Sequence, residues 1–505
     1  MRKSTLFVLS SLCAASLFAG TPMEVVGGNG TQGGRTPIPS GDYDIVLKPN
    51  ESNNAMFSGG YGTVNSLTTS GSPSLWNIAY GLTIDVKTSS NDVIEHAFVN
   101  NGKMSWRIGG VNFKNSLGSS AIAMADFGEE LQLVHNNGEG ESTWMAFNMN
   151  ADVSGTYLNA TMHARTGLKA ANGAVVYYRV ANSKFSYSGS GIFLSGNSTF
   201  NNTGAMEFTS GTVLDIEAGS VFNTTAAPTF KEGSTVNVNG EYNYTGADSA
   251  ISFASDMNVS GTFTAKTMTV ANVDDGSRVR MNIAGNTNFQ AGSKVEIKGA
   301  LAIYKNLVVD SANDYVKLHD FSSVFKGRVM LFDTAELTLN KENALTRVGL
   351  DGSETSVNLL IMSSGTRLIL NASNKFDQLY FSGNNNSVDV VLDDSATLFF
   401  QGMSATAESG NYLNIANFED NRIFFANKEN AESWLTITAT TKDGKTLTMD
   451  DLHFEAGQYT DGTSGYWLNA VAVPEPADYA AILGAIAIAF ALKRKAAALT
   501  ARRGR

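Results

Sequence analysis

A short pattern recurs along the middle of the chain: small residues, most often Gly followed by Ser or Thr, and then alternating apolar and polar residues. The alternation has the period of two expected of a β-strand with one buried face, and Gly suits a turn that precedes it. Few stretches between Gly41 and Asn469 have the 3.6-residue period of a helix. The pattern therefore predicts an all-β fold. Its copies are residues 210–216, 219–222, 233–238, 260–263, 276–281, 292–297, 365–370 and 394–399.

The spacing of these copies favours one all-β architecture over others. Several gaps between them are near 8, 13 to 16 or 28 residues. A turn and a short two-faced strand, repeated without helices, predict a right-handed parallel β-helix (a β-solenoid), in which stacked coils share one apolar interior. An antiparallel sandwich or barrel with Gly-rich hairpins is the alternative. Asn tolerates left-handed backbone and can stack in ladders, and it is frequent at the predicted turns, at positions 201, 202, 223, 237, 239, 384, 385 and 386.

The chain divides into five predicted regions. A signal peptide covers residues 1–20, the solenoid 185–415 and a tail 471–505. Residues 21–184 form an N-terminal β-region that is either a cap with the first coils or a separate β-sandwich. Residues 416–470 are predicted to be a closing β-cap with a hairpin at Lys442-Asp443-Gly444, because an open last coil would expose unpaired strand edges.

The N-terminus has the features of a secretory signal peptide. Arg2 and Lys3 are basic, residues 6–18 are mostly apolar, and Ala19-Gly20 offers small residues for cleavage. Cys13 is the one cysteine of the chain, and Leu12 before it is too large for a lipoprotein signal. The exported protein would then contain no disulfide and depend on its core and hydrogen bonds.

The C-terminal tail has three parts in a fixed order. The extended peptide Val473-Pro474-Glu475-Pro476 comes first, and an uncharged run follows from Tyr479 to Leu492. The basic cluster Lys493-Arg494-Lys495 then follows, with further arginines at 502, 503 and 505. As a helix, the run would rise about 21 Å, short of the ~30 Å hydrocarbon core of a bilayer. It predicts a marginal transmembrane helix whose basic end stays in the cytoplasm.

This order of parts resembles the PEP-CTERM sorting signal of Gram-negative bacteria. The resemblance covers about 35 residues. It implies recognition by an exosortase, a membrane enzyme expected to act near Pro474-Glu475-Pro476 and to pass the protein to the cell surface. The solenoid body also looks like an autotransporter passenger, but an autotransporter would need a C-terminal series of alternating ~10-residue strands, whereas a helical tail is predicted here.

Chemical motifs are few in this sequence. Residues 28–33 match G-x-G-x-x-G by letter, but Pro37 and Pro39 follow and no helix pattern does, which excludes a dinucleotide fingerprint. The five histidines are scattered, and the acidic pairs at 129–130, 274–275, 393–394 and 450–451 stand beside turn residues. Neighbouring strand residues point to opposite faces, so such a pair is not a ready ligand set. No catalytic residue, metal site or cofactor is predicted.

The predicted function depends on the export signals at the two ends and on the repeated strand pattern between them. A net charge of −11 argues against nucleic acid, which needs clustered Lys and Arg. We expect a non-enzymatic surface or extracellular-matrix protein with a structural or adhesive role. Its expected partners are the exosortase-type enzyme, the inner membrane in transit, and extracellular polysaccharide or other matrix proteins. The alternative is a β-helix polysaccharide lyase or hydrolase that carries the same tail.

Overall fold

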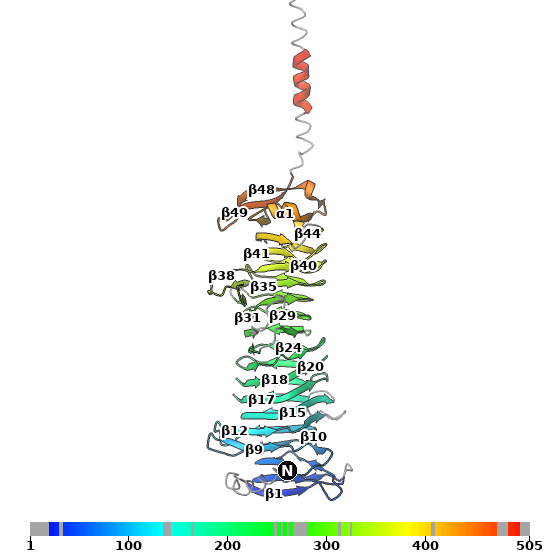
Figure 1. Cartoon of the computed structure of the whole chain (residues 1–505), viewed down its shortest axis with the longest axis vertical. Coiled ribbons are helices and arrows are strands. Elements are labelled where there is room, and N and C mark those ends of the chain that lie inside the picture. The colour runs from blue at the N-terminus through cyan, green and yellow to red at the C-terminus, as the bar shows by residue number, and fades with distance from the viewer. Residues whose placement is uncertain are drawn as a thin grey trace, which may run out of the picture.

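The chain is an all-β protein whose parallel β-solenoid has about 15 coils stacked along one long axis (Figure 1). The computed structural model describes residues 20–29, 34–134, 143–162, 166–246, 250–253, 256–259, 262–265, 280–311, 315–323, 326–405, 410–471 and 483–494. The predicted solenoid is confirmed, and the antiparallel alternative is wrong because the ladders between successive coils are parallel.

Each coil contributes one strand to each of three parallel ladders, which form faces 1, 2 and 3 of the solenoid. Along the chain a coil runs from face 1 to face 2 to face 3 and then returns to face 1. Face 1 consists of β5 (Gly62–Val64), β8 (Leu82–Asp85), β11 (Gly109–Lys114), β14 (Thr143–Phe147), β16 (Thr166–Ala170), β18 (Gly191–Leu194), β21 (Val213–Ile216), β24 (Thr235–Val238), β27 (Asp256–Val259), β30 (Asn286–Phe289), β33 (Asn306–Val309), β36 (Glu336–Leu339), β40 (Thr366–Leu370), β42 (Ser387–Leu392), β44 (Asn411–Phe418) and β46 (Leu435–Thr441).

Faces 2 and 3 share four long strands, which cross from one face to the other: β15 (Asn150–Met162), β17 (Val175–Phe185), β41 (Asn374–Phe381) and β43 (Leu398–Ala405). The other strands of face 2 are β1 (Thr21–Val26), β3 (Tyr43–Lys48), β6 (Ser66–Thr69), β9 (Val93–Val99), β12 (Ile122–Asp126), β19 (Thr199–Asn202), β22 (Val221–Thr224), β25 (Glu241–Tyr244), β28 (Thr262–Ala265), β31 (Lys294–Lys298), β34 (Val316–His319), β37 (Thr346–Val348) and β45 (Ile423–Phe425). Those of face 3 are β2 (Thr36–Pro37), β4 (Met56–Ser58), β7 (Trp76–Ala79), β10 (Lys103–Arg107), β13 (Glu130–Val134), β20 (Ala205–Phe208), β23 (Thr229–Phe230), β26 (Ala250–Phe253), β29 (Arg280–Ile283), β32 (Ala300–Ile303), β35 (Arg328–Leu331) and β39 (Asn358–Ile361).

Parallel ladders also run through residues 21–184. Strand β1 pairs in parallel with β3, and β3 with β6, in the same manner as the later coils. Of the two arrangements left open for this region, the described residues show solenoid coils. Strands β15 and β17 pass from face 2 to face 3 as continuous strands. They therefore lack the turn that separates the two faces in the later coils.

The recurring Gly-Ser or Gly-Thr pair forms the turn before a strand. Gly219 and Gly233 have φ values of +82° and +80°, which L side chains rarely adopt. Each is followed by a buried Ser, and the Ser234 hydroxyl donates a hydrogen bond of 2.6 Å to the carbonyl of Lys231. Gly211, Gly219 and Gly233 precede β21, β22 and β24. Two copies can therefore fall within one coil, and a short gap and a long gap together span that coil.

Inward side chains of neighbouring coils stack on one another. The rings of Phe200 and Phe222 lie 5.7 Å apart at 7°, and those of Phe222 and Tyr242 lie 5.5 Å apart at 23°. A second column contains Phe185, Phe208 and Phe230, with both centroid distances at 4.9 Å. Because every rung repeats the same inward position, one residue type can continue through several coils.

Amide ladders run along the outside. The Asn223 side chain donates to Asn201, and Asn243 donates to Asn223, both at 2.9 Å. Asn201 and Asn223 had been predicted at turns, and the structure places them within β19 and β22. The left-handed backbone expected of Asn occurs at Asn385, whose φ is +61°.

The C-terminal end of the solenoid is covered by antiparallel structure (Figure 1). Strand β49 (Ser464–Ala470) pairs with β45 of the last coil and with β48 (Leu452–Gln458). Strand β47 (Thr446–Leu447) pairs with β46 around the predicted hairpin. The remaining short elements are α1 (Glu429–Trp434), the 3-10 turn η1 (Met449–Asp451) and β38 (Glu354–Ser356), which is antiparallel to β37.

Beyond the cap, residues 483–494 form a helix of 12 residues, drawn in red in Figure 1. It rises about 18 Å. Among the described residues, no helix combines the length and the apolar character needed to cross a membrane. The signal helix of residues 1–20 lies outside the description up to Ala19. Both terminal helices stay predictions in their membrane roles.

Candidate functional site

The predicted sorting residues lie mostly outside the described part of the chain. This applies to Val473, Pro474, Glu475 and Pro476, and also to Ala19, Tyr479 and Lys495. Leu492, Lys493 and Arg494 are exposed at the end of the 483–494 helix, and Gly20 is half-buried directly before β1.

The histidines and acidic pairs of the described residues do not converge. His96 and His453 are exposed, and the imidazole of His319 lies 3.4 Å from the Glu296 carboxylate. Asp394 lies 2.6 Å from Lys442, and Asp451 accepts hydrogen bonds from Thr448. His135, His163 and the pair at 274–275 are outside the described residues. In the described ranges, no three His, Cys, Asp or Glu residues are placed to hold a metal ion.

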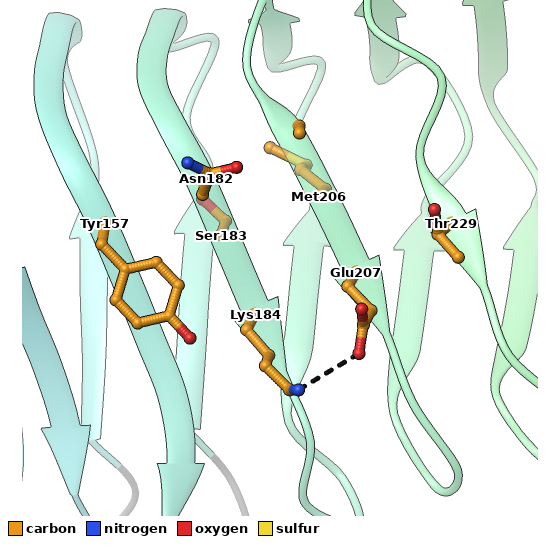
Figure 2. Close-up of a pocket in the computed structure, with 8 residues that line it drawn as sticks. Tyr157, Asn182, Ser183, Lys184, Met206, Glu207 and Thr229 are labelled. Atoms are coloured by element: carbon orange, nitrogen blue, oxygen red, sulfur yellow. Dashed lines mark ion pairs between the residues drawn. The ribbon is translucent and has the colours of Figure 1, made fainter.

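A hollow of about 450 Å³ lies on the outer side of face 3, between β15, β17, β20 and β23 (Figure 2). Lys184 and Glu207 are partners in the ladder, and their charged groups are 3.3 Å apart. Both side chains are about 40% exposed, at 41% and 39%, so water screens the pair and it contributes little binding energy. Tyr157, Asn182 and Thr229 complete a polar, open surface.

A second hollow, of about 270 Å³, lies on the outer side of face 1. Lys169 of β16, Phe193 of β18 and Asp215 of β21 are successive partners in the ladder and line it, with exposed Glu217 just beyond β21. Burial raises the pKa of Asp215, and the nearby Glu217 charge raises it further, while a hydrogen bond from Asn237 acts in the opposite direction. The sequence pattern did not predict these residues as a site.

Trp144 of β14 contacts both the basic residue Lys169 and the aromatic residue Phe193 that line this face 1 hollow. The Lys169 ammonium lies 4.0 Å from the centre of the Trp144 ring. The ring of Phe193 meets that of Trp144 edge to face at 5.2 Å and 85°. Burial lowers the pKa of Lys169. Trp144 pairs with Gly167 in the ladder, and Gly167 pairs with Gly191, which leaves room for the indole to reach Phe193 two coils away.

A third hollow, of about 240 Å³, lies on face 3 over the later coils. Arg328, Asn358, Gln378 and Tyr380 line it, and burial lowers the pKa of Arg328. Leu360 also lines it, and Leu360 and its ladder partner Met330 are buried although they are on the outer side of the ladder. This hollow combines two cations, Lys326 and Arg328, with amides and a phenol, and no carboxylate lines it.

One ion pair near face 2 is buried. The Arg347 guanidinium donates to both carboxylate oxygens of Asp320 at 2.8 and 2.7 Å, and the side chains are 13% and 6% exposed. Burial would raise the pKa of Asp320, but the hydrogen bonds from Arg347 and Gly327 outweigh burial and lower the pKa. The pair ties β37 to the loop after β34, which is a structural role.

Comparison with known proteins gave no match: no family model, no curated protein and no solved structure matches this chain.

Proposed function

We propose that this chain is an exported bacterial surface or extracellular-matrix protein with a non-enzymatic, structural or adhesive role. In this proposal the signal peptide takes the chain through the inner membrane. The tail helix then holds it there with the solenoid outside. An exosortase-type enzyme acts near Pro474-Glu475-Pro476, and the solenoid is displayed at the cell surface or released.

The observation that carries the proposal is the exposure of the tail helix. Every residue of 483–494 except Gly484 is exposed. Leu483 and Phe490 are 64% and 66% exposed, and Ile488 is 63% exposed. The helix therefore buries none of its apolar side chains on the solenoid. A helix of this length is marginal in water on its own, whereas lipid favours a helix because all of its backbone hydrogen bonds are internal.

The sequence of the tail indicates how that apolar helix would be oriented in the membrane. Lys493 and Arg494 form its last turn and are exposed. Basic residues beside an apolar helix stay on the cytoplasmic side. The Pro-Glu-Pro peptide would then lie on the opposite side with the solenoid, where each proline disfavours helix in the residue before it. An extended peptide beside a short membrane helix is accessible to a processing enzyme.

The solenoid supports a structural or adhesive role through its regular exterior. Long outer faces present repeated amides and paired charges, such as the Asn201, Asn223 and Asn243 ladder and the ion pair between Arg179 and Asp152. Such faces suit many weak contacts with an extended partner. The antiparallel cap separates these faces from the tail, so cleavage of the tail leaves every described ladder intact.

The proposal is tested by mapping the C-terminus of the native protein with mass spectrometry, in culture medium, surface extract and membranes. We expect the surface or medium form to end near Val473 to Pro476. A Pro474→Ala, Pro476→Ala double variant should stay in the membrane fraction with an intact tail. Thr500→Ala, in the same tail, serves as the matched control and should be processed normally.

Either of two results would refute the sorting mechanism. If the surface form still contains the peptide that ends at Arg505, the tail is not removed. If the double variant is released like the control, then the Pro-Glu-Pro peptide plays no part in processing. In either case the chain would be an anchored or secreted solenoid without exosortase-type sorting.

A further inference from the structure

We infer that the face 1 hollow is a binding site for a neutral saccharide, contacted by Lys169, Phe193, Asp215 and Glu217. The inference names a ligand class for the displayed solenoid, and it rests on the proposed function for its biological setting. The geometry of the site stands independently of the tail. Its residues come from three successive coils, so the solenoid register itself assembles the site.

The charges in the hollow disfavour an ionic ligand of either sign. Asp215 and Glu217 would repel an anion, and the half-buried Lys169 ammonium would repel a cation. Both signs are present within one hollow of about 270 Å³. A neutral ligand that offers hydroxyl donors to the carboxylates and hydroxyl acceptors to the ammonium satisfies both. This is the polar chemistry of a sugar.

Lys169 also lacks a polar partner of its own. Across the described ranges, its ammonium has no hydrogen bond and no ion pair, and its contact is with the Trp144 ring at 4.0 Å. Burial lowers its pKa, which reflects the loss of water around the charge. An ammonium has three donors and no acceptor. A ligand oxygen at this position would restore hydrogen bonds that burial removes.

Phe193 supplies the apolar wall that distinguishes a sugar from a generic polar ligand. Its ring is half-buried and lines the hollow next to the polar groups. A pyranose ring has an apolar C–H face and a rim of hydroxyls, so it can pack on an aromatic ring while it bonds to polar groups. Binding pockets generally combine aromatic walls with a few placed polar groups.

Trp144 is a positioning residue for this wall. Its edge-to-face contact fixes Phe193, and its ring face holds Lys169. The space that it occupies exists because Gly167 and Gly191 lie next to it in the ladder. A Cβ on Gly167 would lie 1.9 Å from the Gly191 carbonyl oxygen, and φ is +149° there. Glycine is therefore required at position 167, and the absence of side chains at Gly167 and Gly191 leaves room for the indole to contact Phe193.

The test measures binding of the purified full-length protein to immobilised tetrasaccharides by biolayer interferometry. The neutral probes are the tetrasaccharides of glucose, xylose and mannose, and the anionic probe is tetragalacturonate. We expect at least one neutral probe to bind at millimolar concentration or below. Phe193→Ala and Asp215→Asn should each weaken it at least about tenfold, which corresponds to ~1.4 kcal/mol.

Phe332→Ala provides a matched aromatic control. Phe332 is also a half-buried outer aromatic residue, stacked on Tyr304 at 4.5 Å, but it lies far from the hollow on the later coils. Its variant should bind like the unchanged protein. Thermal unfolding of each variant establishes that it is folded. If Phe193→Ala does not fold, Asp215→Asn still tests the inference.

Three outcomes would overturn the inference. The first is that no neutral probe binds at millimolar concentration. The second is that both hollow variants bind as well as Phe332→Ala. The third is that tetragalacturonate binds best and Lys169→Met abolishes it, which would assign an anion site. None of these outcomes depends on tail cleavage, so failure here is distinct from failure of the proposed sorting.

Discussion

Replacement of Phe222 by Ala tests whether the solenoid is stabilised coil by coil. Phe222 is fully buried, and its ring stacks between Phe200 and Tyr242 at 5.7 and 5.5 Å. A buried Phe→Ala change costs about 3–5 kcal/mol, and each lost ring contact adds about 0.5–1.5 kcal/mol. These terms are not fully additive, so we expect a loss of about 5 kcal/mol in the coils that share the stack.

The assay is hydrogen exchange followed by mass spectrometry. Because each coil contacts only its neighbours, stability in a solenoid is a sum of local terms. Amides of β19, β22 and β25 should exchange more than about a thousandfold faster, as ~1.4 kcal/mol corresponds to each factor of ten. Amides of β40 and β42, many coils away, should keep their protection.

Asn223→Ala is the control, since Asn223 is the next residue and points outward. It should cost about 1–2 kcal/mol, because the Asn223 side chain makes two hydrogen bonds, each contributing about 0.5–1.5 kcal/mol. The reasoning would be refuted by equal acceleration of exchange in every coil, which would mean that the rod unfolds as one unit. A loss below about 1 kcal/mol for Phe222→Ala would equally contradict the calculated cavity and stacking terms.

Three further predictions concern a turn, an ion pair and the enzymatic alternative. Gly219→Ala should destabilise by about 1–2 kcal/mol in urea unfolding, because φ is +82° and the new Cβ would meet the Asn197 side chain at 2.1 Å. Since its folded pKa is lowered, Asp320 contributes stability above its unfolded pKa near 3.8 that is lost as pH falls through the folded value. Arg347→Met should cost about 3–5 kcal/mol at neutral pH. It should also reverse the pH dependence, because protonation of the unpaired Asp320 on acidification would then recover part of the lost stability. An unchanged pH profile would contradict this. The protein should release no reducing ends from neutral tetrasaccharides, and release that Asp215→Asn abolishes would favour the hydrolase alternative.

The sequence predicted the coils where the turn chemistry is regular. Gly219-Ser220 and Gly233-Ser234 place a left-handed glycine and a buried hydroxyl before a strand, and the structure repeats this device. The N-terminal coils were harder to predict because β15 and β17 cross two faces without such a turn. Turn residues are the local sequence feature that marks where a coil changes face, so a coil whose strand continues across two faces lacks this mark.

The face 1 hollow could not be predicted for a different reason. Lys169, Phe193 and Asp215 become neighbours only through the register between coils. That register advances by unequal steps: Leu214 pairs with Val236, but Met257 pairs with Thr287. No fixed period aligns such residues in the sequence. Convergence of side chains across coils depends on loop lengths, which the strand pattern leaves open.

Because each coil adds the same rise, the number of coils sets the length of the rod. About 15 coils at ~4.8 Å each give a rod about 70 Å long. Ile192, Leu214 and Val236 occupy one column in identical register, so removal of residues 213–234 would bring Ile192 against Val236 and shorten the rod by one rung. The length of the rod can thus change in steps of ~5 Å by gain or loss of a coil, while the cap keeps its own form; this particular deletion would also remove Asp215 and Glu217 from the face 1 hollow.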